Sequence, residues 1–331
     1  MKKHYISVAM CTYNGEKYVA EQLKSILNQN HPVDEIVIGD DGSTDRTVEI
    51  IEEILKTSKV KYKIIQNETN LGYRKNFENV IANTKGDIIF LSDQDDVWLE
   101  EKVKTLINDL EQDEQYMLVF SDAYIVDSTL NKMSESLWDS VCYNNNRRRF
   151  NNWTEMLCSG YYVTGATVAF RRALFEKAYP FSDLWHHDGW LAMFASLYGK
   201  IYEEKEKLIL YRQHADNQIG AITENSLREK IKNKIIILKK ISKNQRVGRS
   251  TNAQRYRELY ERIKMLDNNK DVYVIKNCVE AQNVMTQIGN VNKIRSLKVI
   301  IDCCLKGYYK KYRKKPFGFC MGDIISCFIS E

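Results

Sequence analysis

Apolar runs alternate with stretches of helical spacing over the first two thirds of the chain. Residues 5–10 and 35–39 are apolar runs that predict strands, and each is followed by a segment with apolar residues at helical spacing, 16–27 and 47–55. The same pattern predicts strands at 62–66, 87–91, 117–122, 162–170 and 207–211, and helices at 74–82, 101–110, 171–178 and 189–198. Strands that alternate with helices predict an α/β fold with a mainly parallel, doubly wound sheet.

Two segments depart from this alternation. Residues 139–153 are polar and rich in Asn and Arg, so we expect an irregular excursion that can order over a ligand. After about Ala221 the spacing is helical almost to the end, with little Gly or Pro. We therefore expect two domains, an α/β domain at 1–221 and a helical, basic one at 222–331.

The fourth predicted strand ends in a cluster of acids. The apolar run 88–91 is followed by Asp93, Asp95 and Asp96, and in open α/β sheets ligands bind just beyond the carboxyl ends of such strands. Clustered carboxylates repel one another unless a cation lies between them, and an all-oxygen ligand set suits Mg²⁺ or Mn²⁺. The alternative is an acidic helix N-terminus, where Asp is also favoured.

A second acidic cluster follows the second strand. Asp40 and Asp41 can accept hydrogen bonds from the imide of a pyrimidine base and from ribose hydroxyls. Ser43, Thr44 and Asp45 are good helix caps, so part of this cluster is expected to be structural. No G-x-G-x-x-G follows the first strand and no G-x-x-x-x-G-K-[ST] occurs, which argues against dehydrogenase and P-loop functions.

Charge is distributed unevenly along the chain. Against a net charge of +5, residues 228–249 carry +8 and residues 306–315 carry +6, which leaves −9 for the remainder. Basic C-terminal segments on an acidic body indicate contact with an anionic surface, either lipid headgroups or nucleic acid; a solvated helix face is the alternative.

The sequence also bears on the cellular compartment. No stretch approaches the roughly 18 to 20 apolar residues that span a bilayer, and the N-terminus lacks the apolar core of a signal peptide. The eight cysteines show no C-x-x-C pair, so reduced thiols and a cytoplasmic location are expected.

Four motifs at strand ends resemble the family 2 glycosyltransferases of the GT-A fold. They are residues 7–15, 40–45, 70–72 and 86–98, in the order that the family shows. The resemblance covers about residues 3–221. More narrowly, residues 93–98, 187–190 and 211–214 are similar to bacterial rhamnosyltransferase-type members that build surface polysaccharides.

The resemblance implies a nucleotide-sugar site. Its residues would be Thr12, Tyr13, Asn14, Glu16, Asp40, Asp41, Arg74, Asp93, Gln94 and Asp96. Thr12, Tyr13 and Glu16 would line the nucleoside pocket and Asp40 would contact the base. Asp93 and Asp95 would hold Mn²⁺ or Mg²⁺, which neutralises the diphosphate leaving group. His214 is a candidate third ligand, with a simple hydrogen-bonding role as the alternative.

The same resemblance implies a catalytic base and an acceptor site. Asp188 would deprotonate the acceptor hydroxyl; alternatively it is the N-cap of the helix at 189–198, and both roles are compatible. His187, Trp190 and Gly165 would contact the acceptor. Tryptophans at these spacings are also common in protein cores.

The expected function is a metal-dependent, inverting transfer of a single sugar. The best match is rhamnose, from dTDP-rhamnose to a growing lipid-linked cell-surface polysaccharide such as a capsule or O-antigen. The Gln-x-x-Arg-Trp signature of the family's processive members is missing. The alternatives are transfer of galactose, glucose or an N-acetylhexosamine from UDP, or a nucleic-acid-binding protein that uses the basic tail.

Aromatic and apolar residues among the lysines of the tail favour a membrane surface. Ile231, Ile235, Leu238 and Ile241 form one helical stripe, and Tyr308, Tyr309 and Tyr312 alternate with Lys310, Lys311 and Arg313. We therefore expect a peripheral enzyme on the inner face of the bacterial cell membrane, with no nucleic-acid partner. A helical packing domain or a homodimer contact is the alternative.

Overall fold

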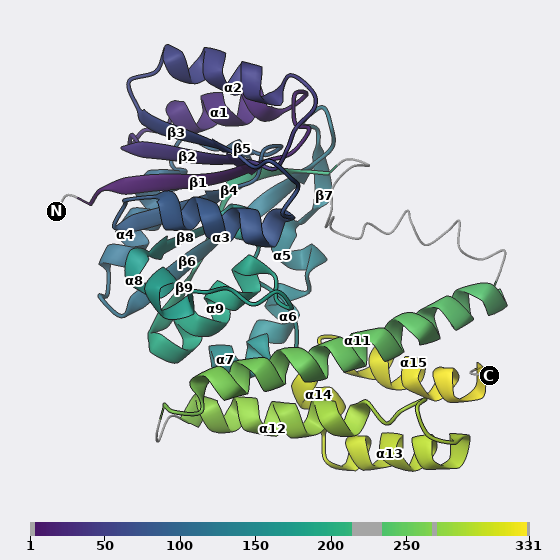
Figure 1. Ribbon diagram of the computed structural model, residues 1–331. Coiled ribbons are helices and arrows are strands. Elements are labelled where there is room, and N and C mark those ends of the chain that lie inside the picture. The colour runs from purple at the N-terminus through teal and green to yellow at the C-terminus, as the bar shows by residue number, and fades with distance from the viewer. Residues whose placement is uncertain (1–3, 214–233, 267–269, 330–331) are drawn as a thin grey trace. The chain divides into compact units, whose positions relative to one another are not determined.

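The computed structural model describes residues 4–213, 234–266 and 270–329 (Figure 1). These residues form two compact units. The first contains residues 4–143 and 161–213, and the second contains 144–160 together with the described C-terminal helices. The predicted boundary at Ala221 lies outside the described residues. The segment 144–160 is part of the second unit although it lies within the first predicted domain.

The first unit is built on one mixed sheet. Its N-terminal half is parallel and consists of β1 (Ile6–Thr12), β2 (Glu35–Asp40), β3 (Lys61–Gln66) and β4 (Ile88–Ser92), in the order β3-β2-β1-β4. In this register Thr12 lies beside Asp40, and Met10 lies beside Ser92. The carboxyl ends of three strands therefore meet at one edge of the sheet, where the sequence places its polar motifs.

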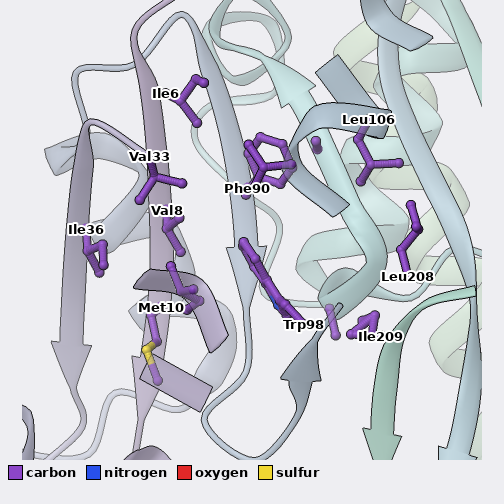
Figure 2. Close-up of a cluster of buried hydrophobic side chains, with 14 of the residues drawn as sticks. Ile6, Val8, Met10, Val33, Ile36, Phe90, Trp98, Leu106, Leu208 and Ile209 are labelled. Carbon is purple, nitrogen blue, oxygen red and sulfur yellow. The ribbon is translucent and has the colours of Figure 1, made fainter. Parts of the chain in front are cut away.

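Helices cover both faces of this sheet. They are α1 (Val19–Leu27), α2 (Thr47–Lys56), α3 (Tyr73–Asn83) and α4 (Lys102–Glu111). Buried residues of α1, α2 and α4 join one apolar cluster with the strands, and Figure 2 shows its centre around Val8, Met10, Phe90 and Trp98. Helix α3 lies on the opposite face from α1 and α2 (Figure 1). Strands β1, β2 and β4 are buried on both sides, which explains their mainly apolar sequences, whereas the edge strand β3 is largely exposed.

The second half of the sheet mixes strand directions. It contains β5 (Val97–Trp98), β6 (Tyr116–Val126), β7 (Lys132–Ser136), β8 (Val168–Arg171) and β9 (Lys200–Arg212). The order continues β4-β8-β6-β9-β5, with β7 paired to β6; only the β6 and β9 pair is parallel here. The remaining elements of this unit are α5 (Leu137–Ser140), η1 (Gly165–Thr167), α8 (Arg172–Ala178) and α9 (His187–Tyr198).

The predicted α/β fold is confirmed, and the errors lie in this second half. The strand predicted at 162–170 begins only at Val168, because a 3-10 turn occupies Gly165–Thr167. Strand β9 begins at Lys200 rather than 207; its first residues are charged, and pairing with β6 makes them a strand. The two-residue β5 depends on pairing with β9, so local sequence does not reveal it. The excursion predicted at 139–153 is largely helical.

The second unit is entirely helical in its described part. Its helices are α6 (Tyr143–Arg147), which begins in the first unit, α7 (Trp153–Leu157), α11 (Lys234–Ile263), α12 (Lys270–Met285), α13 (Lys293–Leu305), α14 (Tyr308–Tyr312) and α15 (Pro316–Ile329). Its centre combines an apolar cluster with a buried ion pair between Arg249 and Asp323, and Tyr309 donates a hydrogen bond to Asp323 at 2.7 Å. Among the described residues, none of the helices combines the length and the apolarity needed to cross a bilayer.

The structure corrects one part of the membrane prediction. Tyr309 and Tyr312 are buried in the second unit, so their rings are not available to lipid headgroups. Arg313 is buried as well and donates a hydrogen bond to Gln282 at 3.1 Å. The predicted stripe at 231–241 lies outside the residues whose side chains are described.

Candidate active site

A cavity of about 740 Å³ lies in the first unit at the carboxyl ends of β1, β2 and β4. Helix α3, the segment 161–165, the start of α9 and the end of β9 complete its wall. Ten of the predicted site residues line it: Thr12, Tyr13, Asn14, Asp41, Asp93, Gln94, Asp95, Gly165, His187 and Asp188. The cavity therefore brings together residues that are up to 176 positions apart in the sequence, from Thr12 to Asp188.

Two predicted acids are buried beside the cavity rather than in its wall. Asp40 accepts hydrogen bonds from the Thr12 hydroxyl at 2.8 Å and from the backbone and hydroxyl of Ser43 at 2.8 and 2.6 Å. Asp96 is also buried, and one of its oxygens accepts a hydrogen bond from the backbone N–H of Arg212 at 3.0 Å. Both carboxylates hold the loops that carry the site.

Three further predicted residues do not line the cavity. Glu16 accepts a hydrogen bond from the backbone of Arg46 at 3.0 Å, and Arg74 donates to Tyr73 and to the backbone carbonyl of Asp183. Trp190 is fully buried, and its indole N–H donates to the carbonyl of Ala178 at 2.8 Å. Trp190 is thus part of the core, and the structure does not bring it to the acceptor site. His214 lies outside the described residues.

Two loops of the cavity, which follow β1 and β4, are tied together by one amide. The side chain of Gln94 accepts a hydrogen bond from the backbone N–H of Tyr13 at 2.8 Å and donates to the Tyr13 carbonyl at 3.0 Å. Gly15 is needed here, since a Cβ at this position would lie 2.2 Å from the Gln94 amide oxygen. The Tyr13 ring itself is 43% exposed and free to stack on a planar base.

Asp41 fixes the turn that leads into α3. Its carboxylate accepts hydrogen bonds from the backbone N–H groups of Leu71 at 2.7 Å and Gly72 at 2.9 Å, and from the side chain of Asn67 at 3.0 Å. Gly72 has a φ of 77°, a left-handed conformation that favours glycine. The motif at 70–72 is therefore a turn whose shape depends on an acid from β2.

Three carboxylates share the other end of the cavity. Burial, and then repulsion from Asp95 and Asp188, raises the pKa of Asp93 to about 7. Behind them lies the buried Lys102, whose ammonium donates to the carbonyl of Ala166 at 2.7 Å and whose pKa burial holds well below its usual value. The nearest cation is thus itself poorly solvated, and the carboxylates repel one another.

This donor set fits a hard divalent cation that keeps open coordination positions. Within the described ranges, no group of three or more His, Cys, Asp or Glu side chains is arranged to enclose a metal ion. Mg²⁺ is commonly bound by one or two carboxylates and completes its shell with water and substrate phosphates. Asp93 and Asp95 supply two carboxylates at a cavity wide enough for a diphosphate.

Asp188 lies in the first turn of α9 and its carboxylate is held from two sides. The backbone N–H of Gly165 donates to one oxygen at 3.0 Å and that of Gly189 donates to the other at 2.6 Å. Burial raises the pKa of Asp188, against the opposing effect of His186. The N-cap of α9 is His186, so the alternative that Asp188 is this helix's N-cap is wrong.

His187 is a buried imidazole in the cavity wall with no hydrogen-bond partner among the described residues for either ring nitrogen. Its ring stacks on Phe77 with centroids 4.0 Å apart, and a Cβ on Gly165 would lie 2.7 Å from its Nε2. Burial, and then the charge of Arg74, lowers the pKa of His187 to about 3. The neutral ring carries one donor and one acceptor, and the surrounding side chains shield both nitrogens from solvent.

Replacing His187 with Asn is expected to weaken the pH dependence of stability. The pKa of His187 is lower in the folded protein than in the unfolded chain, so the unfolded chain binds more protons than the folded protein between about pH 3 and 6.5. Stability is therefore lost as the pH falls through this range. Between pH 7 and pH 5 the free energy of unfolding should fall by about 2 kcal/mol less in the variant than in the wild type. Urea unfolding followed by tryptophan fluorescence measures this. The exposed His31→Asn is the matched control, and parallel pH profiles for H187N and the wild type would contradict the expectation.

Sequence reasoning missed several aromatic residues of the cavity and one anchoring arginine. Tyr73, Phe77, Tyr161 and Tyr211 line the cavity. Arg212 is buried and binds the acidic loop, with its Nε donating to the Asp95 carbonyl at 2.7 Å. It also pairs with Glu21. The motif at 211–214 contains Tyr211 and Arg212, but within it the resemblance implies a site role for His214 alone.

A parallel α/β half-sheet with an acidic cavity at its strand ends, facing a carboxylate on a later helix, is the architecture of the GT-A glycosyltransferases. The family model of glycosyl transferase family 2 matches residues 7–178. The chain belongs to this family and is a glycosyltransferase.

Individual relatives agree with this assignment. A dTDP-rhamnosyl transferase of Shigella flexneri, RfbG, is 32% identical over 224 residues, which cover 64% of this chain and 74% of that protein. An uncharacterized glycosyltransferase of Nostoc sp. is 29% identical over 68% of this chain and 70% of its own length.

Two solved structures share the fold. Residues 1–349 of S. aureus TarS align with 98% of this chain and 89% of that chain, with a TM-score of 0.57 and 17% identity. The mannosyltransferase PcManGT of Pyrobaculum calidifontis, in complex with GDP-Man and Mn²⁺, aligns with 99% and 88%, with a TM-score of 0.53 and 14% identity. At these identities the likeness concerns the fold alone.

Proposed function

We propose that this glycosyltransferase moves a single sugar from a nucleoside-diphosphate donor to a hydroxyl of a lipid-linked cell-surface glycan, with inversion. Rhamnose from dTDP-rhamnose is the favoured donor. The observation that carries the proposal is the cavity that Asp93 and Asp95 share with Asp188. The relative named as a dTDP-rhamnosyl transferase supports the choice of sugar.

The donor would enter with its nucleoside against the ends of β1 and β2. Tyr13 offers an exposed ring to the base, and Asn14 and Asp41 line the same end of the cavity. Thr12 and Asp40, which bind each other, shape the floor rather than contact the base directly. The diphosphate would then lie toward Asp93 and Asp95.

Asp188 would act as the general base. One of its oxygens removes the proton from the acceptor hydroxyl, whose oxygen forms the new bond to the anomeric carbon. The bond from that carbon to the diphosphate oxygen breaks on the opposite face, and the electron pair leaves with the diphosphate. The hydrogen bonds from Gly165 and Gly189 orient the carboxylate for this step.

A divalent cation fits beside Asp93 and Asp95, and when bound it would neutralise the charge that develops on the leaving diphosphate. At the acceptor end, the buried His187 ring would shape the cavity wall, and Gly165 leaves room for this ring. The proposed location is the inner face of the cell membrane, because the basic C-terminal segments suit an anionic surface.

A panel of donors tests the proposal directly. With Mn²⁺ present, dTDP-rhamnose is expected to raise the melting temperature more than UDP-glucose, UDP-galactose or UDP-N-acetylglucosamine, since a ligand that binds only the folded state stabilises it. The same donors are followed for nucleoside diphosphate release. Stabilisation by one UDP-sugar alone would favour the hexose alternative, and the absence of binding by every donor would overturn the proposed function.

A further inference from the structure

The large apolar side chains that are exposed on the second unit include four from the end of α13 and the start of α15. Ile301 and Leu305 of α13 are 58% and 83% exposed, and Phe317 and Met321 of α15 are 80% and 40% exposed. We call these four residues the apolar patch. Single exposed apolar residues are normal on protein surfaces, whereas a group of them marks an interaction site.

The four residues belong together in space. The Sγ atoms of Cys304 and Cys320 lie 3.5 Å apart, so the end of α13 meets the start of α15. Each cysteine is a sequence neighbour of a patch residue, Leu305 or Met321. Residues four apart on a helix share one face, which adds Ile301 beside Leu305 and Phe317 beside Met321.

A strongly basic segment connects the two halves of the patch. Between Leu305 and Pro316 the chain carries six Lys or Arg and no acid. The structure divides this segment by exposure. Two of its three tyrosines, Tyr309 and Tyr312, are buried together with Arg313, while four lysine side chains are exposed. They are Lys306, Lys310, Lys311 and Lys315.

Acids near the patch are already neutralised. Asp302 forms an ion pair with Lys306 at 2.9 Å, and Asp323 is buried against Arg249. The rings of Tyr309 and Tyr312 thus anchor the segment inside the unit, and its exposed lysines lie between Leu305 and Phe317 in the sequence. This arrangement combines apolar side chains with positive charge at Lys310, Lys311 and Lys315.

We propose that the apolar patch and its lysines form a docking surface for an anionic lipid bilayer. Leu305 and Phe317 would insert among the headgroups while the lysines contact lipid phosphates. A second copy of the chain is a poorer occupant, because a symmetric contact over this surface would bring like charges together. The described helices do not span a bilayer, so the contact would be peripheral.

The location proposed above for the enzyme rests on the same contact, but vesicle binding can be measured without any sugar transfer. The full-length protein is floated with phosphatidylcholine vesicles, with and without phosphatidylglycerol. Wild-type protein should float with the anionic vesicles and release at high salt. Leu305→Ser/Phe317→Ser and Lys310→Glu/Lys311→Glu should each reduce the bound fraction about tenfold or more.

Matched controls come from the same unit. Met265 and Tyr273 are 82% and 61% exposed and lie outside the patch, so Met265→Ser/Tyr273→Ser should bind anionic vesicles as the wild type does. All variants replace exposed side chains, and circular dichroism with donor thermal shifts verifies that the fold and the cavity are intact. Loss of flotation with retained donor binding supports the docking surface independently of the reaction.

Several outcomes would overturn the inference. They are equal binding to neutral and anionic vesicles, no binding by the wild type, or unchanged flotation of both patch variants. Light scattering provides a further test. If the wild type is a dimer and L305S/F317S is a monomer, while flotation is unchanged, the patch binds a second copy of the chain instead of lipid. Failure of every donor to bind would remove the proposed function but leave the flotation result readable.

Discussion

Asp188→Asn is expected to reduce sugar transfer by roughly 10²- to 10⁴-fold while donor affinity stays near that of the wild type. The amide keeps the shape of the carboxylate but cannot take a proton from the acceptor hydroxyl. The side-chain NH₂ of the new Asn also faces the backbone N–H of Gly165 or Gly189, from which it cannot accept a hydrogen bond. A loss of about 1 kcal/mol in the free energy of unfolding should therefore accompany the substitution. That loss is far too small to explain the predicted fall in rate.

The measurement separates chemistry from binding. Initial rates with a saturating acceptor give kcat, and thermal shift with the donor gives binding in the same variant. Asp183→Asn is the matched control: this carboxylate is exposed and forms an ion pair with the partly exposed Lys75, so its replacement should leave kcat unchanged. A D188N enzyme with more than about a tenth of the wild-type kcat would rule out Asp188 as the general base.

The N-terminal half of the fold follows closely from the sequence because its signals are local. Strands β1, β2 and β4 are short, mainly apolar runs that each end in a polar motif. Parallel pairing then brings those motifs to one edge, as the register of Thr12 with Asp40 shows. The convergence of Asp41, Asp93 and Asp95 on one cavity was predictable from that rule without knowledge of a single side-chain contact.

Side-chain direction within the loops was not predictable. Asp93, Asp95 and Asp96 lie within four residues, yet only the first two line the cavity, because the backbone of Arg212, at the end of the neighbouring strand β9, binds Asp96. The same limit applies to Trp190, whose position next to Asp188 and Gly189 suggested an acceptor contact. On α9 it faces the core instead, where Ala178 accepts its indole N–H.

Burial also decided between two interpretations of the basic tail. Tyr309 and Tyr312 alternate with lysines, a pattern that fits either a membrane face or a helical core. The structure buries both tyrosines, and the hydrogen bond from Tyr309 to Asp323 accounts for one of the hydroxyls. Leu305 and Phe317, two exposed apolar residues that flank the segment, carried no signal in its sequence pattern.

Asp95→Asn is the second substitution with a large expected effect, a fall in metal-dependent turnover on the order of 10²-fold or more. A single charge removed beside the diphosphate takes away several kcal/mol of stabilisation of the leaving group, and each 1.36 kcal/mol corresponds to a tenfold change in rate. Removal of metal with EDTA should reduce the wild-type rate to a similar level. Asp93→Asn should behave alike, because the two carboxylates line the same part of the cavity.

Titration of Mn²⁺ distinguishes loss of metal affinity from loss of fold. Wild-type rates should rise to a plateau, whereas D95N should need a higher Mn²⁺ concentration and reach a lower plateau. Arg212 donates a hydrogen bond to the backbone carbonyl of Asp95, and the substitution keeps this bond. The conformation of the loop and the melting temperature should therefore change little. Asp183→Asn again serves as the control. Two outcomes would contradict this prediction: wild-type turnover that persists in EDTA, or a D95N variant with the wild-type Mn²⁺ response. Either would show that these carboxylates serve the donor without a metal. The acidic cluster would then need a different role, such as contact with the sugar hydroxyls.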